Sequence, residues 1–212
     1  MKSKYRFVFF DVDSTLVTIE GIDVLARGNP EIVHLTEMAM NGDISVDAVY
    51  GRRLEVIKPT RADVEQLGEQ YIASMVDGVP ETIETLRSGG AHIHLVTAGI
   101  AQAIEPLAKK LDIRNVHAVS LRFDEQGQYA GFDNRSLLAR SGGKELVVRS
   151  VLARSKGTSA FVGDGVTDLE AKPVVDLFVG FGGVHERARV RENAEVYVTA
   201  PTLTAVLPYL MV

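Results

Sequence analysis

The chain has 212 residues, of which 46% are hydrophobic and 24% are charged, enough for one core or a core with a smaller insertion. Its net charge of −5 is not that of a general nucleic-acid binder, and the lack of Cys excludes disulfides, zinc thiolate sites and thiol catalysis. No segment approaches the roughly 20 apolar residues of a membrane span, and the basic start at residues 1–4 precedes too short an apolar run for a signal peptide. We expect a cytoplasmic monomer or homodimer with no nucleic-acid or membrane partner.

The first apolar run, residues 5–10, is aromatic and β-branched and predicts a buried parallel strand. It is followed directly by Asp11 and Asp13. Residues two apart in extended backbone point to the same side, so both carboxylates leave the carboxyl end of the strand together. Open α/β sheets bind their ligands at this end. Because two carboxylates this close repel, one pKa should rise unless a cation intervenes. The pattern indicates a metal site, an acid/base pair, or both.

Residues 22–71 contain amphipathic helical stretches but no convincing strand. Turn and helix-start signals divide this region at residues 28–30, 41–42 and 58–60. We expect one helix opened by Asn29 or Pro30 and running to residue 40. A second, capped by Ser45, should reach residue 57, and a third, capped by Thr60, should run towards residue 74. The region therefore predicts a small helical cap, residues 18–75, inserted after the first strand into a core made of residues 1–17 and 76–212.

After residue 78 the chain alternates helical patterns with short apolar runs. The elements expected here are a helix at 81–87, a strand at 91–96, a helix at 100–111, a hairpin of 116–123 with 129–132, a helix at 144–153, a strand at 159–162, a helix at 166–171, strands at 177–179 and 195–198, and a C-terminal helix. This order predicts an α/β fold: a Rossmann-like, mostly parallel sheet with helices on both faces.

Three further motifs stand at expected strand or helix ends. Thr97-Ala98-Gly99 offers a hydroxyl and backbone N–H groups at a helix start, which suits a phosphate or carboxylate. Lys144 follows Ser-Gly-Gly and supplies a positive charge. The stretch 163–168 brings Asp164, Thr167 and Asp168 after a strand. Hard oxygen ligands without a His or Cys pattern favour Mg²⁺ over zinc. Phosphoryl transfer requires groups of this kind: Mg²⁺, a lysine, backbone amides and a carboxylate nucleophile.

Each motif has an ordinary structural interpretation when taken alone. Asp11 and Asp13 could be a helix cap and a turn residue, Thr97 a cap, and Lys144 a solvated surface lysine. Their occurrence in order along one chain favours a functional site. His92 and His94 have no third ligand partner and are interpreted as structural. Residues 180–183 lack the order of a phosphate-binding glycine loop and predict a turn.

Together these motifs resemble the haloacid-dehalogenase-like phosphatases and, within that superfamily, the phosphoserine phosphatases. The resemblance is carried by residues 11–16, 20–23, 97, 129–133, 141–144, 163–171 and 181–183. It implies a haloacid-dehalogenase-like core with a small helical cap between its first two motifs. It also implies Mg²⁺-dependent hydrolysis of a small phosphomonoester, O-phosphoserine, to serine and phosphate through an aspartyl-phosphate.

The resemblance implies roles for the acidic residues. Asp11 is the nucleophile that accepts the phosphoryl group. Asp13 protonates the leaving seryl oxygen and then helps to activate water. Mg²⁺ is held by the Asp11 carboxylate, the Asp13 backbone carbonyl and Asp164, and Asp168 supports them nearby.

The resemblance also assigns the remaining contacts. Phosphoryl oxygens are bound by Thr97, Ala98, Gly99, Lys144 and Thr167. In the cap, Glu20 meets the substrate ammonium, Arg53 meets its carboxylate, and Met40 covers the closed pocket. One departure is that Thr97-Ala98-Gly99 replaces the family's Ser-Gly-Gly. The hydroxyl and the N–H are retained, but Ala98 adds a methyl group and disfavours positive φ.

Other functions stay open at this point. The nearest is a phosphatase or phosphotransferase of the same fold acting on another small phosphorylated metabolite. A phosphoacceptor signalling domain also gathers Asp and Lys around Mg²⁺, but it has no helical insertion and usually places its acidic residues on different strands. A non-catalytic binding module is disfavoured because no core catalytic residue is missing. A haloacid dehalogenase would not need an acid at Asp13.

Overall fold

The computed structural model describes residues 2–212 and is built on a six-stranded sheet. The sheet order is β3-β2-β1-β6-β7-β8, and every neighbouring pair is parallel. Its strands are β1 (Phe7–Phe10), β2 (His92–Ile100), β3 (Asn115–Val119), β6 (Ser159–Gly163), β7 (Leu177–Phe181) and β8 (Val196–Val198). Strands β2 and β3 are added in turn on one side of β1, and β6, β7 and β8 are then added on its other side. The strand order therefore reverses between β1 and β6, where α/β sheets form a ligand crevice.

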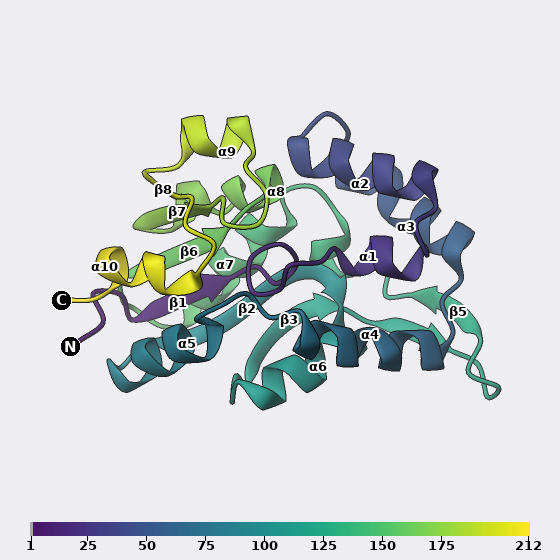
Figure 1. Cartoon of the computed structure of the whole chain (residues 1–212), viewed down its shortest axis with the longest axis horizontal. Coiled ribbons are helices and arrows are strands. Elements are labelled where there is room, and N and C mark those ends of the chain that lie inside the picture. The colour runs from purple at the N-terminus through teal and green to yellow at the C-terminus, as the bar shows by residue number, and fades with distance from the viewer. Residues whose placement is uncertain (1) are drawn as a thin grey trace.

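Helices flank the sheet (Figure 1). They are α5 (Val79–Ser88), α6 (Ala101–Lys110), α7 (Gly143–Arg154), α8 (Val166–Leu169), α9 (Ala188–Asn193) and α10 (Leu207–Leu210), with 3₁₀ turns at Leu137–Ala139, Lys172–Val174 and Leu203–Val206. All four residues of β1 are buried, so both faces of this strand are covered. The predicted Rossmann-like α/β fold is confirmed. Within residues 2–212, no helix combines the length and apolarity that a membrane crossing requires.

The region between β1 and α5 is helical, as the sequence predicts. It comprises α1 (Gly21–Leu25), α2 (Pro30–Asn41), α3 (Val46–Ile57) and α4 (Arg61–Ala73). The Asn29 side chain caps α2, and Thr60 caps α4 in a reciprocal capping box with Asp63. Ser45 occupies the cap position of α3, but its side chain makes no cap hydrogen bond. Helix α1 was not predicted because five residues are too few to display helical periodicity.

The chain leaves the core and returns to it at one point. Val17 and Met75 form an antiparallel bridge, and the Val76 N–H donates to the Leu16 carbonyl at 2.9 Å. This closure supports our proposed cap boundaries, residues 18–75. Helix α4 is nevertheless packed directly on core helix α6 (Figure 1). A Cβ atom on Gly68 would lie 3.1 Å from the Ala103 carbonyl oxygen, so the missing side chain allows the two helices to approach closely.

Several predicted boundaries were wrong, and the helix predicted at 166–171, for example, ends at Leu169. The strand predicted at 91–96 continues to Ile100, because buried Ile100 still pairs with Val119 after a register shift. Thr97-Ala98-Gly99 therefore lies in a strand end and not at a helix start. The strand predicted at 116–123 is split: β3 joins the main sheet, whereas β4 (Leu121–Phe123) pairs antiparallel with β5 (Tyr129–Phe132). Strand β7 extends through Phe181 because Gly180 and Phe181 pair with β8, so the predicted turn begins at Gly182.

Candidate active site

The two acidic motifs meet at the carboxyl ends of β1 and β6. These strands are direct neighbours, with Phe10 opposite Val162, so the residues that follow them leave the sheet side by side. Carboxylate oxygens of Asp11, Asp164 and Asp168 lie within 4.8 Å of one another, and all three residues are buried. Like charges this close repel strongly in a buried site. The cluster could hold a divalent cation, which would remove that repulsion.

Lys144 enters the cluster from the first turn of α7. Its Nζ lies 3.0 Å from Asp11 Oδ1 and 2.5 Å from Asp168 Oδ1, and the residue is 4% exposed. Burial lowers the pKa of Lys144, but the charges of Asp11 and Asp168 outweigh burial and raise the pKa above its usual value. The second oxygen of Asp168 accepts a 2.8 Å hydrogen bond from the Gly165 N–H. Asp168 thus fixes both the lysine and the loop that carries Asp164.

Asp13 points away from this cluster and towards the cap. Its Oδ1 accepts hydrogen bonds from the Gly21 N–H at 2.7 Å and from the Tyr71 hydroxyl at 2.8 Å. Burial, and then the nearby charge of Asp11, raise the pKa of Asp13 to about 7. A carboxyl group with this pKa exists in both protonation states near neutral pH. Two aspartates only two residues apart therefore have different surroundings, one beside a lysine and one beside a tyrosine.

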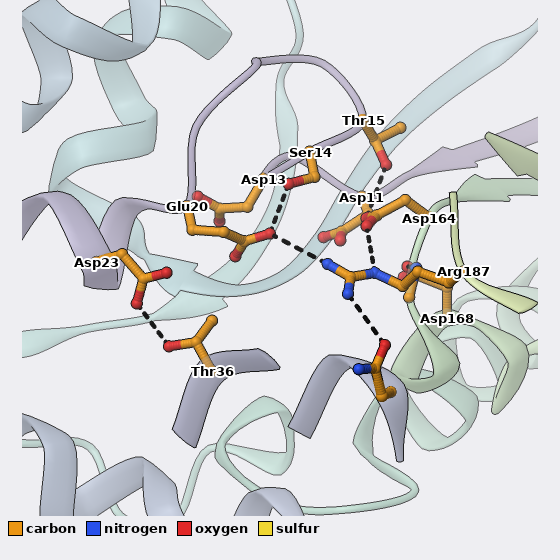
Figure 2. A network of polar contacts seen from close by, with 12 residues as sticks. Asp11, Asp13, Ser14, Thr15, Glu20, Asp23, Thr36, Asp164, Asp168 and Arg187 are labelled. Atoms are coloured by element: carbon orange, nitrogen blue, oxygen red, sulfur yellow. Dashed lines mark hydrogen bonds and ion pairs between the residues drawn. The ribbon is translucent and has the colours of Figure 1, made fainter. Parts of the chain in front are cut away.

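An arginine that the sequence analysis did not select connects the cluster with the cap. Arg187 Nε donates to Asp164 Oδ2 at 3.0 Å, and its Nη1 donates to Asn41 Oδ1 at 3.3 Å at the end of α2. Arg187 Nη2 also lies 3.9 Å from Glu20 Oε1, and Figure 2 marks this ion pair with a dashed line. The available signal was its position soon after the end of β7, since carboxyl ends of parallel strands share one edge.

One oxygen of Glu20 has two partners. The Ser14 hydroxyl donates to Glu20 Oε1 at 2.6 Å, and Arg187 Nη2 approaches the same oxygen (Figure 2). Ser14 has a φ of 53°, a left-handed conformation that is uncommon for residues other than glycine. Burial is the main cause that raises the pKa of Glu20 well above its usual value, and the charges of Asp13 and Asp164 add to it.

The predicted phosphate-binding residues surround one cavity. Thr97 is almost fully buried, and its Oγ1 accepts a 3.0 Å hydrogen bond from the Gly99 N–H. Ala98 does not have positive φ, so its methyl group causes no backbone strain there. The Ala98 carbonyl instead accepts a 2.8 Å hydrogen bond from the Tyr50 hydroxyl. Replacement of the family's Ser-Gly-Gly by Thr-Ala-Gly is therefore compatible with this strand end.

The cap closes the other side of the same cavity, which has a volume of about 80 Å³. Arg53 is buried, and its Nη1 donates to Thr36 Oγ1 at 3.0 Å, whereas its Nε has no hydrogen-bond partner within residues 2–212. A buried donor of this kind is costly unless a ligand satisfies it. The predicted contact residues that line the cavity are Asp11, Asp13, Glu20, Met40, Arg53, Thr97, Ala98, Gly99, Lys144 and Thr167.

Comparison with known proteins agrees with this architecture. The family model for haloacid dehalogenase-like hydrolases matches residues 8–171. The phosphoserine phosphatase of Bos taurus is 38% identical over 198 residues, covering 91% of this chain and 88% of the relative. That of Drosophila melanogaster is 34% identical over 201 residues, covering 92% and 74%.

Solved structures share the fold. A phosphoserine phosphohydrolase-like protein from Francisella tularensis has a TM-score of 0.87 at 25% identity, with all of both chains covered. A phosphoserine phosphatase solved as a phospho-aspartyl intermediate analogue has a TM-score of 0.85 at 23% identity, covering 98% of this chain and 100% of the other. With the family model and these relatives, the chain belongs to the haloacid dehalogenase-like hydrolases, in the family of the phosphoserine phosphatases.

Proposed function

We propose that this chain hydrolyses O-phosphoserine to serine and phosphate through an aspartyl-phosphate on Asp11, with Mg²⁺ as its cofactor. The observation that carries the proposal is that two sets of charged groups line the same cavity. Asp11 and Lys144 form its core side, beside a buried acidic cluster, and the unpartnered Nε of Arg53 lies on its cap side. Relatives named phosphoserine phosphatase, at up to 38% identity, support the same substrate.

The donor set fits Mg²⁺. Its groups are buried carboxylate oxygens, and Asp11 Oδ1 makes an ion pair with Lys144 but no hydrogen bond within the described residues. Hard oxygen ligands without thiolate or imidazole suit this ion. The Asp11 carboxylate, the Asp13 backbone carbonyl and Asp164 would hold it, with Asp168 in support. When bound, Mg²⁺ neutralises charge on the carboxylates and on the phosphoryl oxygens.

In the first half-reaction the Asp11 carboxylate attacks phosphorus, and the bond to the seryl oxygen breaks. Lys144 and Thr97 hold the phosphoryl oxygens, with the backbone of Ala98 and Gly99 beside them. Asp13 gives its proton to the departing seryl oxygen, which a group with a pKa near 7 can do at neutral pH. In the second half-reaction the ionised Asp13 takes a proton from water as that water attacks the aspartyl-phosphate, which restores both side chains.

The cap supplies recognition of the amino acid. In our proposal Arg53 binds the substrate carboxylate, because its buried Nε lacks a partner among the described residues. Glu20 binds the ammonium group, and Met40 covers the pocket where its methyl group lies against Gly165. Thr167 adds a hydroxyl at the rim. Location in the cytoplasm and a monomeric or homodimeric state stay predictions.

A kinetic panel tests the proposal. Purified protein with Mg²⁺ should hydrolyse phosphoserine with a higher kcat/KM than phosphorylated sugars, phosphothreonine or p-nitrophenyl phosphate, and EDTA should abolish this activity. Acid quenching during turnover of ³²P-phosphoserine should trap label on the polypeptide. Preference for another ester by orders of magnitude would replace the substrate with another phosphorylated metabolite. A labelled protein that does not release phosphate would instead support a phosphoacceptor signalling domain.

A further inference from the structure

Asp13 has a partner in the cap that the mechanism above does not use. Tyr71 lies on α4, is 1% exposed, and donates its hydroxyl hydrogen bond to Asp13 Oδ1 at 2.8 Å. The Gly21 N–H donates to the same oxygen at 2.7 Å. Asp13 is the only hydrogen-bond partner of the Tyr71 hydroxyl within residues 2–212. A buried tyrosine hydroxyl needs such a partner, and here the partner is the acid of the proposed reaction.

The space for this contact is provided by Gly21. A Cβ atom at position 21 would lie 2.0 Å from the Tyr71 hydroxyl oxygen and 3.2 Å from Asp13 Oδ1. The backbone of Gly21 does not have positive φ, so its conformation does not demand glycine. The absence of a side chain is required by the close approach of the tyrosine hydroxyl to the carboxylate.

Tyr71 is supported by the packing of its helix on the core. Helix α4 lies on α6 of the core, and Gly68, one turn before Tyr71, allows the helix backbones to approach (Figure 1). The tyrosine ring is among the largest fully buried side chains of the chain. Tyr71 therefore holds Asp13 from a helix, α4, that is packed on the core.

The two donors decide which oxygen of Asp13 carries the proton. Oδ1 accepts from Gly21 and Tyr71, so its lone pairs are occupied. Oδ2 lies beside the strand end that carries Thr97, where a Cβ atom on Gly99 would be 3.0 Å from it. When Asp13 is protonated, its O–H is therefore on Oδ2, the oxygen nearer the predicted phosphate-binding residues.

We propose that Tyr71 is a positioning residue: with Gly21, it fixes the Asp13 carboxyl group so that Oδ2 presents the proton to the leaving oxygen. This inference rests on the proposed function, because it assumes that Asp13 is the acid. It predicts an effect that depends on the leaving group. An alkoxide such as that of serine must be protonated as it departs, whereas p-nitrophenolate departs without a proton.

The test is Tyr71→Phe, which keeps the buried ring and removes only the hydroxyl. We expect kcat/KM to fall about 10-fold or more for phosphoserine and for simple alkyl phosphates. For p-nitrophenyl phosphate we expect less than about a 3-fold fall. A series of alkyl and aryl phosphates should show a steeper dependence of rate on leaving-group pKa than the wild type shows. Tyr209→Phe, at a 42% exposed tyrosine near the C-terminus, is the matched control and should leave the series unchanged.

Gly21→Ala provides an independent variant, because its methyl group would displace the tyrosine hydroxyl. It should reproduce the selective loss on alkyl phosphates, and the double variant with Tyr71→Phe should be no worse than the more impaired single variant. Thermal unfolding of each protein checks the fold.

Equal losses on alkyl and aryl esters in both variants, or no loss in either, would overturn the positioning role. Should Tyr71→Phe fail to fold, Gly21→Ala decides the question alone. A wild-type protein that hydrolyses no phosphomonoester would instead overturn the proposed function, so the two failures are distinguishable.

Discussion

The two sides of the cavity are built differently. On the core side, Lys144 is already paired with Asp11 and Asp168, and these groups follow strands or open a core helix. On the cap side, Arg53 has an unpartnered Nε within the described residues, and the pKa of Glu20 is raised because the residue is buried among other acids. The charged groups of the core side are thus paired with one another, whereas the cap side presents a buried donor without a partner among the described residues.

The difference has a structural origin. Parallel pairing of β1 with β2 and β6 fixes Asp11 and its neighbours through a register that buried apolar side chains enforce. Helices α2 and α3 carry no such register, and α2 meets the core through separate side-chain contacts, such as Asn41 with Arg187 and Met40 beside Gly165. Substitutions on the core side should therefore lower the rate of hydrolysis of every phosphomonoester. Substitutions on the cap side should lower it for some phosphomonoesters more than for others.

The largest effect should follow Asp11→Asn, which removes the proposed nucleophile. We expect kcat to fall by at least about a thousandfold for phosphoserine and for p-nitrophenyl phosphate alike. The fold should persist, because the substitution also removes one of the repelling charges beside Asp164 and Asp168. Steady-state rates and circular dichroism check both parts, and activity near the wild-type level would exclude Asp11 as the nucleophile.

Arg53→Ala should have a smaller and selective effect. Loss of a buried charged partner should lower kcat/KM for phosphoserine about 30-fold or more, equivalent to about 2 kcal/mol. Hydrolysis of p-nitrophenyl phosphate, which has no carboxylate, should change little. Arg52→Ala is the matched control, because Arg52 is exposed and paired with Glu31 on the surface. If both substrates suffer equally from Arg53→Ala, Arg53 does not recognise the carboxylate.

Arg189→Ala should weaken the attachment of the cap to the core without changing a residue that lines the cavity. Arg189 Nη1 donates to the Gly42 carbonyl at 3.0 Å, and its Nη2 lies 3.4 Å from Asp43 Oδ1, just beyond α2. Both contacts are exposed, so together they contribute about 1 kcal/mol. We expect KM for phosphoserine to rise by up to about 5-fold with kcat nearly unchanged. Arg191 lies on the same helix, α9, and pairs with Glu186 just before it, so Arg191→Ala should not change KM.

The last prediction concerns stability and not activity, at the sheet below the site, where His94 Nδ1 and His117 Nε2 lie 3.2 Å apart. Burial, and then His117 and His92, lower the pKa of His94 to about 4 from the value of 6.5 that it regains on unfolding. Between pH 6.5 and 4 the unfolded chain therefore binds more protons at His94 than the folded chain does. The free energy of unfolding consequently decreases as the pH falls from 6.5 towards 4. Denaturant unfolding of wild type and His94→Gln across this range should show a weaker pH dependence in the variant, and equal slopes would contradict it.

Local signals determined much of this protein from the sequence alone. The apolar run before Asp11 is long enough to specify a buried strand, and β1 occupies that position. Asn29 and Thr60 mark helix starts because their side chains satisfy backbone N–H groups within three residues, which is a local property. The parallel α/β fold follows from the alternation of such elements. The meeting of Asp11 and Asp164 follows from the rule that ligands bind at carboxyl strand ends.

Only the tertiary structure decided which side chains meet across the cap and the core. Tyr71 reaches Asp13 over 58 positions of sequence, and Arg187 reaches Asn41 over 146. Helical periodicity gives the face of α4 but not its depth against α6, which depends on the absence of a side chain at Gly68. The split of residues 116–123 between two sheets likewise depends on which strands are available to pair. Propensity and pattern act over a few residues, whereas these contacts depend on how whole elements pack together.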